Sequence, residues 1–249
     1  MSSLARFLFA LGAAVAAASL LAASLRRRAL PSDLPAQLVP SSHMAGRNRS
    51  FILWLHGLGD SGPANEPIRT FFSASEFRLT KWAFPSAPNA PVSCNHGAVM
   101  PSWFDIHELP LSAMTVGFSR LWKMCHAMIN KEVVDGVHPE NIFVCGFSQG
   151  GALTLASVLL YPKTLGGGEQ CLAGGCLSVH QSSRGFHLKQ GRTILFEAGQ
   201  AGPPFLQSVG VSCEFKAYPD LGHSISKEEL QVLESWIKSR LKASQGKDN

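Results

Sequence analysis

The sequence predicts an α/β fold with a mostly parallel sheet that is covered by helices on both faces. Apolar runs of strand length alternate with longer segments whose apolar residues recur at helical spacing. This alternation is typical of parallel sheets, because each return to the same sheet edge needs a crossover helix. The pentapeptide at 146–150, GFSQG, also lies between an apolar run and a helix-favouring run. The length of 249 residues suits one domain with a full core.

Composition divides the chain into three regions. We expect an apolar N-terminal segment at 1–28, a linker at 29–49 and the folded domain at 50–249. Residues 1–49 hold six of the 22 basic residues and one of the 17 acidic ones, so the domain has 16 of each (22 − 6 and 17 − 1). It is therefore neutral, and no nucleic-acid-binding surface is expected.

Residues 7–25 form an uninterrupted apolar run, with Arg6 before it and a triple arginine at 26–28. The run is just long enough to span a bilayer, and the triple arginine would keep an anchored domain on the cytoplasmic side. A secretory signal, an organelle transit peptide and an extension upstream of Met44 are the alternatives. We expect a cytoplasmic domain, with membrane association through 7–25 as one of these outcomes.

The predicted strands are short and apolar. The first, Ser50–Leu55, runs into a glycine-rich loop that begins at His56. Backbone amides in such a loop, at the carboxyl edge of a sheet, are candidates for an oxyanion hole. Further strands are expected at 79–84, 142–145, 171–178, 193–196 and 211–217.

Helices are expected at 66–75, 113–134, 152–160 and 227–242. The last helix places five apolar residues on one face, namely Leu230, Leu233, Trp236, Ile237 and Leu241. Residues 85–105 are rich in Pro, Gly and Ser and predict a loop across the substrate mouth. The aromatic residues Trp103 and Phe104 in this loop look exposed, so they are candidates for substrate binding.

Cysteine and histidine spacing indicates no metal site. The six cysteines show no C-x-x-C or zinc pattern, and free, buried thiols in a reducing compartment are expected. The nine histidines show no H-E-x-x-H or other ligand spacing.

The pentapeptide at 146–150 has the G-x-S-x-G pattern of a nucleophile elbow, in which a strand turns sharply into a helix. Glycines are needed there because the turn brings two backbones close together. Ser148 is therefore the candidate nucleophile. His223 lies in a short glycine-containing loop after the last predicted strand, which makes it the candidate general base.

Five motifs together resemble the acyl-protein thioesterase/carboxylesterase family of α/β-hydrolases, close to its plant members. They occupy 55–62 (LHGLGDSG), 85–88 (PSAP), 100–105 (MPSWFD), 146–152 (GFSQGGA) and 218–224 (YPDLGHS). The resemblance implies Ser148 as nucleophile, His223 as general base and the N–H groups of Leu58 and Gln149 as the oxyanion hole. It also implies hydrolysis of carboxylic esters or acyl thioesters, such as palmitoyl-cysteine in proteins, without a cofactor.

One motif of that family is missing. Its members carry an H-G-x-x-D-x-x-V segment whose Asp is the catalytic acid, and nothing between Ser178 and the family-like stretch at 193–204 matches it. We expect that a late strand and its acid are deleted and that the protein is inactive or strongly impaired. Loss of the triad acid lowers kcat about 10⁴-fold in well-studied enzymes.

Two alternatives stay open, a working esterase with a substitute acid and a non-catalytic protein that binds acyl chains or a partner. Four acidic residues lie between Ser148 and His223, namely Glu169, Glu197, Glu214 and Asp220. Glu197 is the candidate substitute, because it ends the predicted strand at 193–196. Glu214 falls within a strand, Asp220 is too close to His223, and Glu169 follows a glycine run far from the expected strand end.

Overall fold

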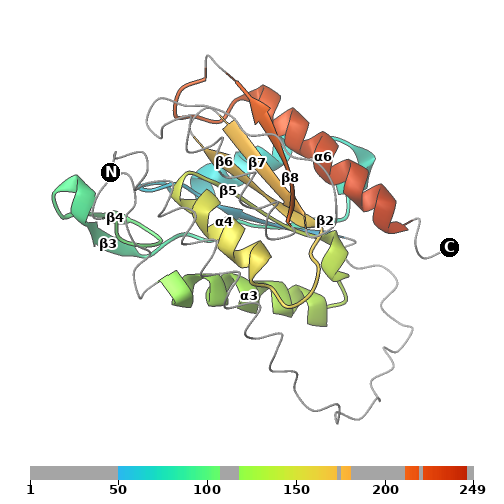
Figure 1. Ribbon diagram of the computed structural model, residues 1–249, viewed down its shortest axis with the longest axis horizontal. Coiled ribbons are helices and arrows are strands. Elements are labelled where there is room, and N and C mark those ends of the chain that lie inside the picture. Colours follow the sequence, from blue (N-terminus) through green and yellow to red (C-terminus); the bar gives the residue numbers. More distant parts are fainter. Residues whose placement is uncertain (1–49, 107–117, 173–174, 181–210, 219–220, 246–249) are drawn as a thin grey trace, which may run out of the picture.

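The structure is a computed structural model that describes residues 50–106, 118–172, 175–180, 211–218 and 221–245. Within these ranges a six-stranded sheet has the order β2-β1-β5-β6-β7-β8 (Figure 1). Its strands are β1 (Ser50–Leu55), β2 (Thr80–Ala83), β5 (Ile142–Phe147), β6 (Gly167–Leu172), β7 (Gly175–His180) and β8 (Ser212–Ala217). The pairings from β2 to β6 are parallel, and β7 is antiparallel to both neighbours. The predicted mostly parallel sheet is confirmed.

Helices cover both faces of this sheet, as predicted. Every residue of β1 is buried. Phe51, Leu53 and Leu55 pack with α3 (Phe118–Val134) and α4 (Gln149–Leu159), whereas Ile52 and Trp54 pack with α6 (Lys227–Gln245). Figure 1 shows α6 on one side of the sheet and α3 and α4 on the other. A strand buried on both faces explains why β1 reads as a continuous apolar run.

The apolar face predicted for the last helix is confirmed, because all five of its residues are buried under the sheet. Helix α3 is confirmed over the described part of the predicted range, and residues 113–117 lie outside it. Cys125 and Ile129 of α3 are fully buried. Helical spacing thus predicted the face of α6 that meets the core.

The helix predicted at 66–75 is wrong in type and extent. The chain forms a short α2 (Gly62–Asn65), the 3₁₀ helix η1 (Glu66–Phe71) and then a second 3₁₀ turn, η2 (Ser75–Phe77). Phe72 leaves helical geometry at φ −95° and ψ 82°. Its ring packs edge-on against those of Phe77 and Trp82, with centroids 5.2 and 4.8 Å away. Burial of Phe72 therefore overrides local helix propensity.

The loop predicted at 85–105 contains a β-hairpin instead. Strands β3 (Asn89–Val92) and β4 (Ala98–Pro101) pair antiparallel, with the 3₁₀ turn η3 (Ser93–Asn95) between them. His96 and Gly97 both have positive φ, at 55° and 76°, which reverses the chain. At the turn end, Asp105 holds Ser93, accepting hydrogen bonds from its N–H and hydroxyl at 2.7 and 2.6 Å.

The single strand predicted at 171–178 is the end of β6 and the start of β7. The glycines before it have a packing role, because a Cβ on Gly168 would lie 2.7 Å from a methyl carbon of Val158 in α4. Glu169 lies inside β6 and is 1% exposed, so its expected place before the strand is wrong. The strand predicted at 193–196 lies outside the described residues.

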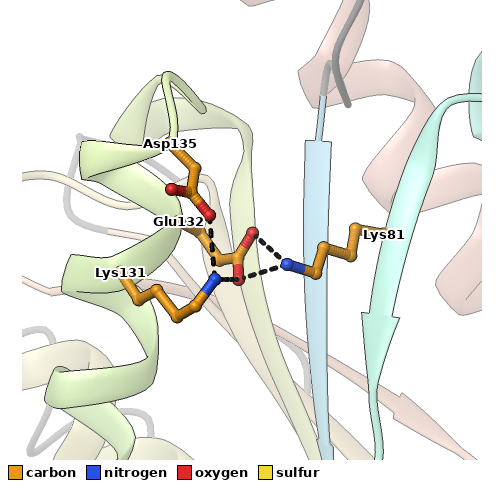
Figure 2. A network of polar contacts seen from close by, with 4 residues as sticks. All are labelled: Lys81, Lys131, Glu132 and Asp135. Carbon is orange, nitrogen blue, oxygen red and sulfur yellow. Dashed lines mark hydrogen bonds and ion pairs between the residues drawn. The ribbon is translucent and has the colours of Figure 1, made fainter.

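An ion-pair network joins edge strand β2 to α3 (Figure 2). Lys81 Nζ donates to both carboxylate oxygens of Glu132, at 2.7 and 2.9 Å. The Glu132 side chain is 6% exposed, and Lys131 Nζ lies 3.9 Å from it and 2.9 Å from Asp135. The buried carboxylate therefore depends mainly on Lys81 for compensation of its charge.

Among the described cysteine side chains, Cys125 and Cys213 are free and buried, as expected, and Cys145 is buried. Burial raises the pKa of the Cys125 thiol to about 11, which keeps it protonated and unreactive. The expected burial is wrong for Cys94, which is exposed. No helix within the described ranges has the length and apolar character to cross a bilayer, and 7–25 lies outside them.

Candidate active site

Ser148 occupies a strained turn between β5 and α4. Its φ of 51° and ψ of −115° are rare for a residue with a side chain. The surrounding glycines permit this turn: a Cβ on Gly146 would lie 2.6 Å from the Gly150 carbonyl, and one on Gly150 would overlap the Leu55 carbonyl. The predicted strand, sharp turn and helix are therefore present, with glycine required by close backbone approach.

His223 lies against Ser148, although the two residues are 75 positions apart. Its Nε2 is 3.1 Å from the Ser148 Oγ, within hydrogen-bond reach. The loop after β8 brings it there, because β5, β6 and β8 end at the same edge of the sheet. The sequence predicted Ser148 as the nucleophile and His223 as the base, and the structure brings their side chains together.

The environment of the imidazole favours its neutral form. The His223 ring packs against that of Phe147, with centroids 4.8 Å apart, while the residue as a whole is exposed. Burial of the ring lowers the pKa of His223 below its ordinary value. A neutral imidazole is the form that can accept the Ser148 proton.

No acidic side chain among the described residues forms a hydrogen bond or ion pair with His223. Glu169 and Glu214 lie within β6 and β8. The candidate Glu197, like Asp220, lies outside the described residues, so its assignment stays a prediction.

The loop that carries Leu58 lies directly beside the nucleophile. A Cβ on Gly57 would be 3.5 Å from Cβ of Ser148. The loop forms a tight turn in which the Asp60 N–H donates to the Gly57 carbonyl at 3.3 Å and Gly59 has a φ of 77°. Gln149 begins α4 immediately after Ser148. The predicted oxyanion residues thus flank Ser148 from two segments.

The expected exposure of Trp103 is wrong, because this residue is buried. It is 3% exposed, its backbone N–H donates to Gln149 Oε1 at 2.9 Å and its indole N–H donates to the His56 carbonyl at 2.8 Å. Phe104 is half-buried, and its carbonyl accepts from Gln149 Nε2 at 2.7 Å. Substrate binding by Trp103 and Phe104 stays a prediction, but the side chain of Trp103 packs in the core.

Sequence reasoning missed His56 as a site residue. Its ring is fully buried, with Nδ1 2.7 Å from the Gly57 carbonyl and Nε2 accepting from the Ala87 N–H at 2.9 Å. Because Nε2 accepts, the ring hydrogen lies on Nδ1. The sequence feature that could have identified it is the position of a histidine directly after a buried strand and before a glycine.

Comparison with known proteins identifies the family of this chain. The phospholipase/carboxylesterase family profile matches residues 42–241. The chain belongs to the phospholipase/carboxylesterase family. A probable carboxylesterase of Oryza sativa subsp. japonica is 68% identical to this chain over 268 aligned positions, which cover 100% of both proteins. Acyl-protein thioesterase 1 of Saccharomyces cerevisiae is 34% identical over 217 residues, 78% of this chain and 93% of the yeast protein.

Carboxylesterase SOBER1 of Arabidopsis thaliana is 56% identical over 212 residues, which cover 79% of this family member and 92% of SOBER1. The crystal structure of SOBER1 superposes with a TM-score of 0.67 at 50% identity, covering 78% of this chain and 99% of that one. The relatives are thus carboxylesterases and acyl-protein thioesterases. Both the resemblance described above and the α/β-hydrolase fold are confirmed.

Proposed function

We propose that this chain binds carboxylic esters or acyl thioesters at Ser148 and hydrolyses them at a strongly reduced rate. One observation carries the proposal. The Ser148 hydroxyl and the His223 Nε2 are 3.1 Å apart, whereas no described acidic residue pairs with His223. The nucleophile and base are therefore assembled without an evident third member.

The assembled pair supports acyl chemistry. Neutral His223 takes the proton from Ser148 as the oxygen attacks the acyl carbon, and the amides of Leu58 and Gln149 stabilise the negative charge that develops on the substrate oxygen. Proton return from His223 to the departing alcohol or thiol then leaves an acyl-enzyme for water to cleave. The names of SOBER1 and of the yeast acyl-protein thioesterase support esters and acyl thioesters as the substrate class.

Three observations support impairment. The H-G-x-x-D-x-x-V segment is missing from the sequence. The alignment with the rice relative has 268 positions, 19 more than the 249 residues of this chain, so at least that many positions have no counterpart here. His223 also lacks a described acidic partner. A triad acid holds the ring in the productive tautomer, and its loss costs about 10⁴-fold, or about 5.5 kcal/mol of transition-state stabilisation.

A fluorophosphonate probe tests the proposal. The full chain is expected to label slowly at Ser148, and Ser148→Ala should abolish the labelling. The reference is a family member that carries the H-G-x-x-D-x-x-V segment, measured at the same probe concentration. Labelling as fast as that of the reference would show that the chain is not impaired, and no labelling at Ser148 would show that the site is not assembled.

We also propose that the folded domain lies in the cytosol. The free thiols of Cys125 and Cys213 suit a reducing compartment, and the triple arginine at 26–28 favours cytoplasmic retention of residues that follow it. Asn48 begins an N-x-S sequon that is modified only in the secretory pathway. Glycosidase treatment of the chain made in plant cells should leave its gel mobility unchanged, and glycosylation at Asn48 would refute this location.

A further inference from the structure

Trp103 connects two segments that flank the nucleophile. Its backbone N–H donates to Gln149 Oε1, 46 residues away, at 2.9 Å. Its indole N–H donates to the His56 carbonyl, 47 residues away in the other direction, at 2.8 Å. With Trp103 only 3% exposed, both bonds are shielded from water. Buried hydrogen bonds hold geometry tightly, because a group that loses its partner there has no water to replace it.

At one end, the Gln149 side chain is held on both polar atoms. Oε1 accepts from Trp103, while Nε2 donates to the Ser102 hydroxyl at 3.0 Å and to the Phe104 carbonyl at 2.7 Å. Gln149 is 4% exposed and follows Ser148 directly. The start of α4, with the Gln149 backbone amide, is therefore fastened to the segment at 102–104.

At the other end, His56 controls the direction of one peptide group. Its Nδ1–H donates to the Gly57 carbonyl at 2.7 Å, and its ring packs against that of Trp103 with centroids 5.0 Å apart. The Gly57 carbonyl and the Leu58 N–H belong to one peptide plane and point in opposite directions when the peptide is trans. Holding that carbonyl therefore fixes the direction of the Leu58 N–H.

We propose that Trp103 is a positioning residue that sets the distance between the two oxyanion amides, those of Leu58 and Gln149. The inference rests on the proposed function, because the amides matter only if acyl chemistry occurs at Ser148. Oxyanion donors are effective when they are held about 2.7–3.1 Å from the developing negative charge. Trp103 does not contact that oxygen; it acts through His56 and Gln149.

The variant Trp103→Phe tests this role, because it keeps an aromatic ring in the core and removes the indole N–H. We expect Ser148 labelling by the fluorophosphonate to slow by about tenfold or more, less than the roughly 10²–10³-fold cost of deleting an oxyanion donor outright. Affinity for a trifluoromethyl ketone should fall in parallel, since its serine adduct carries the oxyanion. A purely structural role would change unfolding but leave both of these readouts in place.

Tyr161→Phe is the matched control. It also removes one aromatic hydrogen-bond donor from a buried residue, the Tyr161 hydroxyl that donates to Oδ1 of the exposed Asn130 at 2.7 Å, at the contact between α3 and the chain after α4. Labelling and ketone affinity should equal those of the unmodified chain. Equal losses in Tyr161→Phe and Trp103→Phe would overturn the proposal, because they would show a general effect of a lost aromatic hydrogen-bond donor.

Gln149→Met removes the hydrogen bond between the Trp103 N–H and Gln149 Oε1, which is the other contact through which Trp103 acts. This variant tests the proposal if Trp103→Phe fails to fold. Gln149→Met should slow Ser148 labelling by a similar factor. In the double variant, labelling should slow by less than the product of the two single effects, because both substitutions interrupt the same connection between His56 and Gln149 through Trp103. Unchanged labelling in either folded variant, or fully multiplicative losses, would overturn the role of Trp103. No labelling of the unmodified chain would instead overturn the proposed function at Ser148.

Discussion

The imidazole ring of His223 packs against the ring of Phe147, with centroids 4.8 Å apart and planes tilted by 36°. Phe147 ends β5 directly before Ser148, so the strand that carries the nucleophile also shields its base. Burial lowers the pKa of His223, whereas an acidic partner would raise it.

This contact predicts the pH dependence of Ser148 labelling. The base works when neutral, so the rate should rise as His223 loses its proton and then reach a plateau. Because the pKa of His223 is lowered, half of the plateau should be reached below about pH 6.5, the ordinary value for histidine. Phe147→Ala should move this midpoint up toward about 6.5. A midpoint above that value in the unmodified chain would reveal an anionic partner and contradict the proposed impairment.

Gly150→Ala should destabilise the fold and stop Ser148 labelling. The added Cβ would overlap the Leu55 carbonyl, a backbone atom of the central strand that has no room to move. Overpacking of this kind costs about 3 kcal/mol, which urea unfolding at pH 7 can measure. Gly222→Ala is the control beside His223, since a Cβ there meets nothing within 4 Å. Equal stability of the two variants would refute the packing argument.

Lys81→Met should lower the free energy of unfolding by about 2 kcal/mol, because the buried Glu132 would then keep, among the described residues, only Lys131 at 3.9 Å as a counter-charge. Lys131→Met is the matched control in the same network (Figure 2). The Lys131 side chain is 65% exposed and this variant leaves Lys81 in place, so the free energy of unfolding should fall less than in Lys81→Met. A larger loss from Lys131→Met would show that Lys81 is not the main partner.

We predict that Glu197 is a solvated acid outside the triad, so Glu197→Gln should leave ester turnover unchanged and cost less than about 1 kcal/mol of stability. A substitute triad acid would behave differently. Its loss would lower turnover by two or more orders of magnitude and add almost nothing to the loss from His223→Ala, because triad residues act as a unit. A hundredfold fall in turnover with Glu197→Gln would show a working triad.

Local patterns in the sequence determined strands β1 and β5, the elbow and the buried face of α6. The apolar run at 50–55 needed no tertiary information, because a strand buried on both faces is apolar throughout. The G-x-S-x-G pattern predicted the turn at Ser148 for a similar reason, since only glycine permits such close backbone contact.

Only the tertiary structure decided the features that depend on residues far apart in the chain. The chain at 66–75 does not form the predicted helix, because Phe72 is buried against Trp82. The sequence around Trp103 likewise did not indicate that this residue would be buried and hydrogen-bonded to His56 and Gln149. The 3.1 Å between His223 and Ser148 likewise depends on three strands ending at one sheet edge. A sequence pattern records the preferences of neighbours, whereas these contacts join residues that lie from 10 to 75 positions apart in the chain and arise from packing.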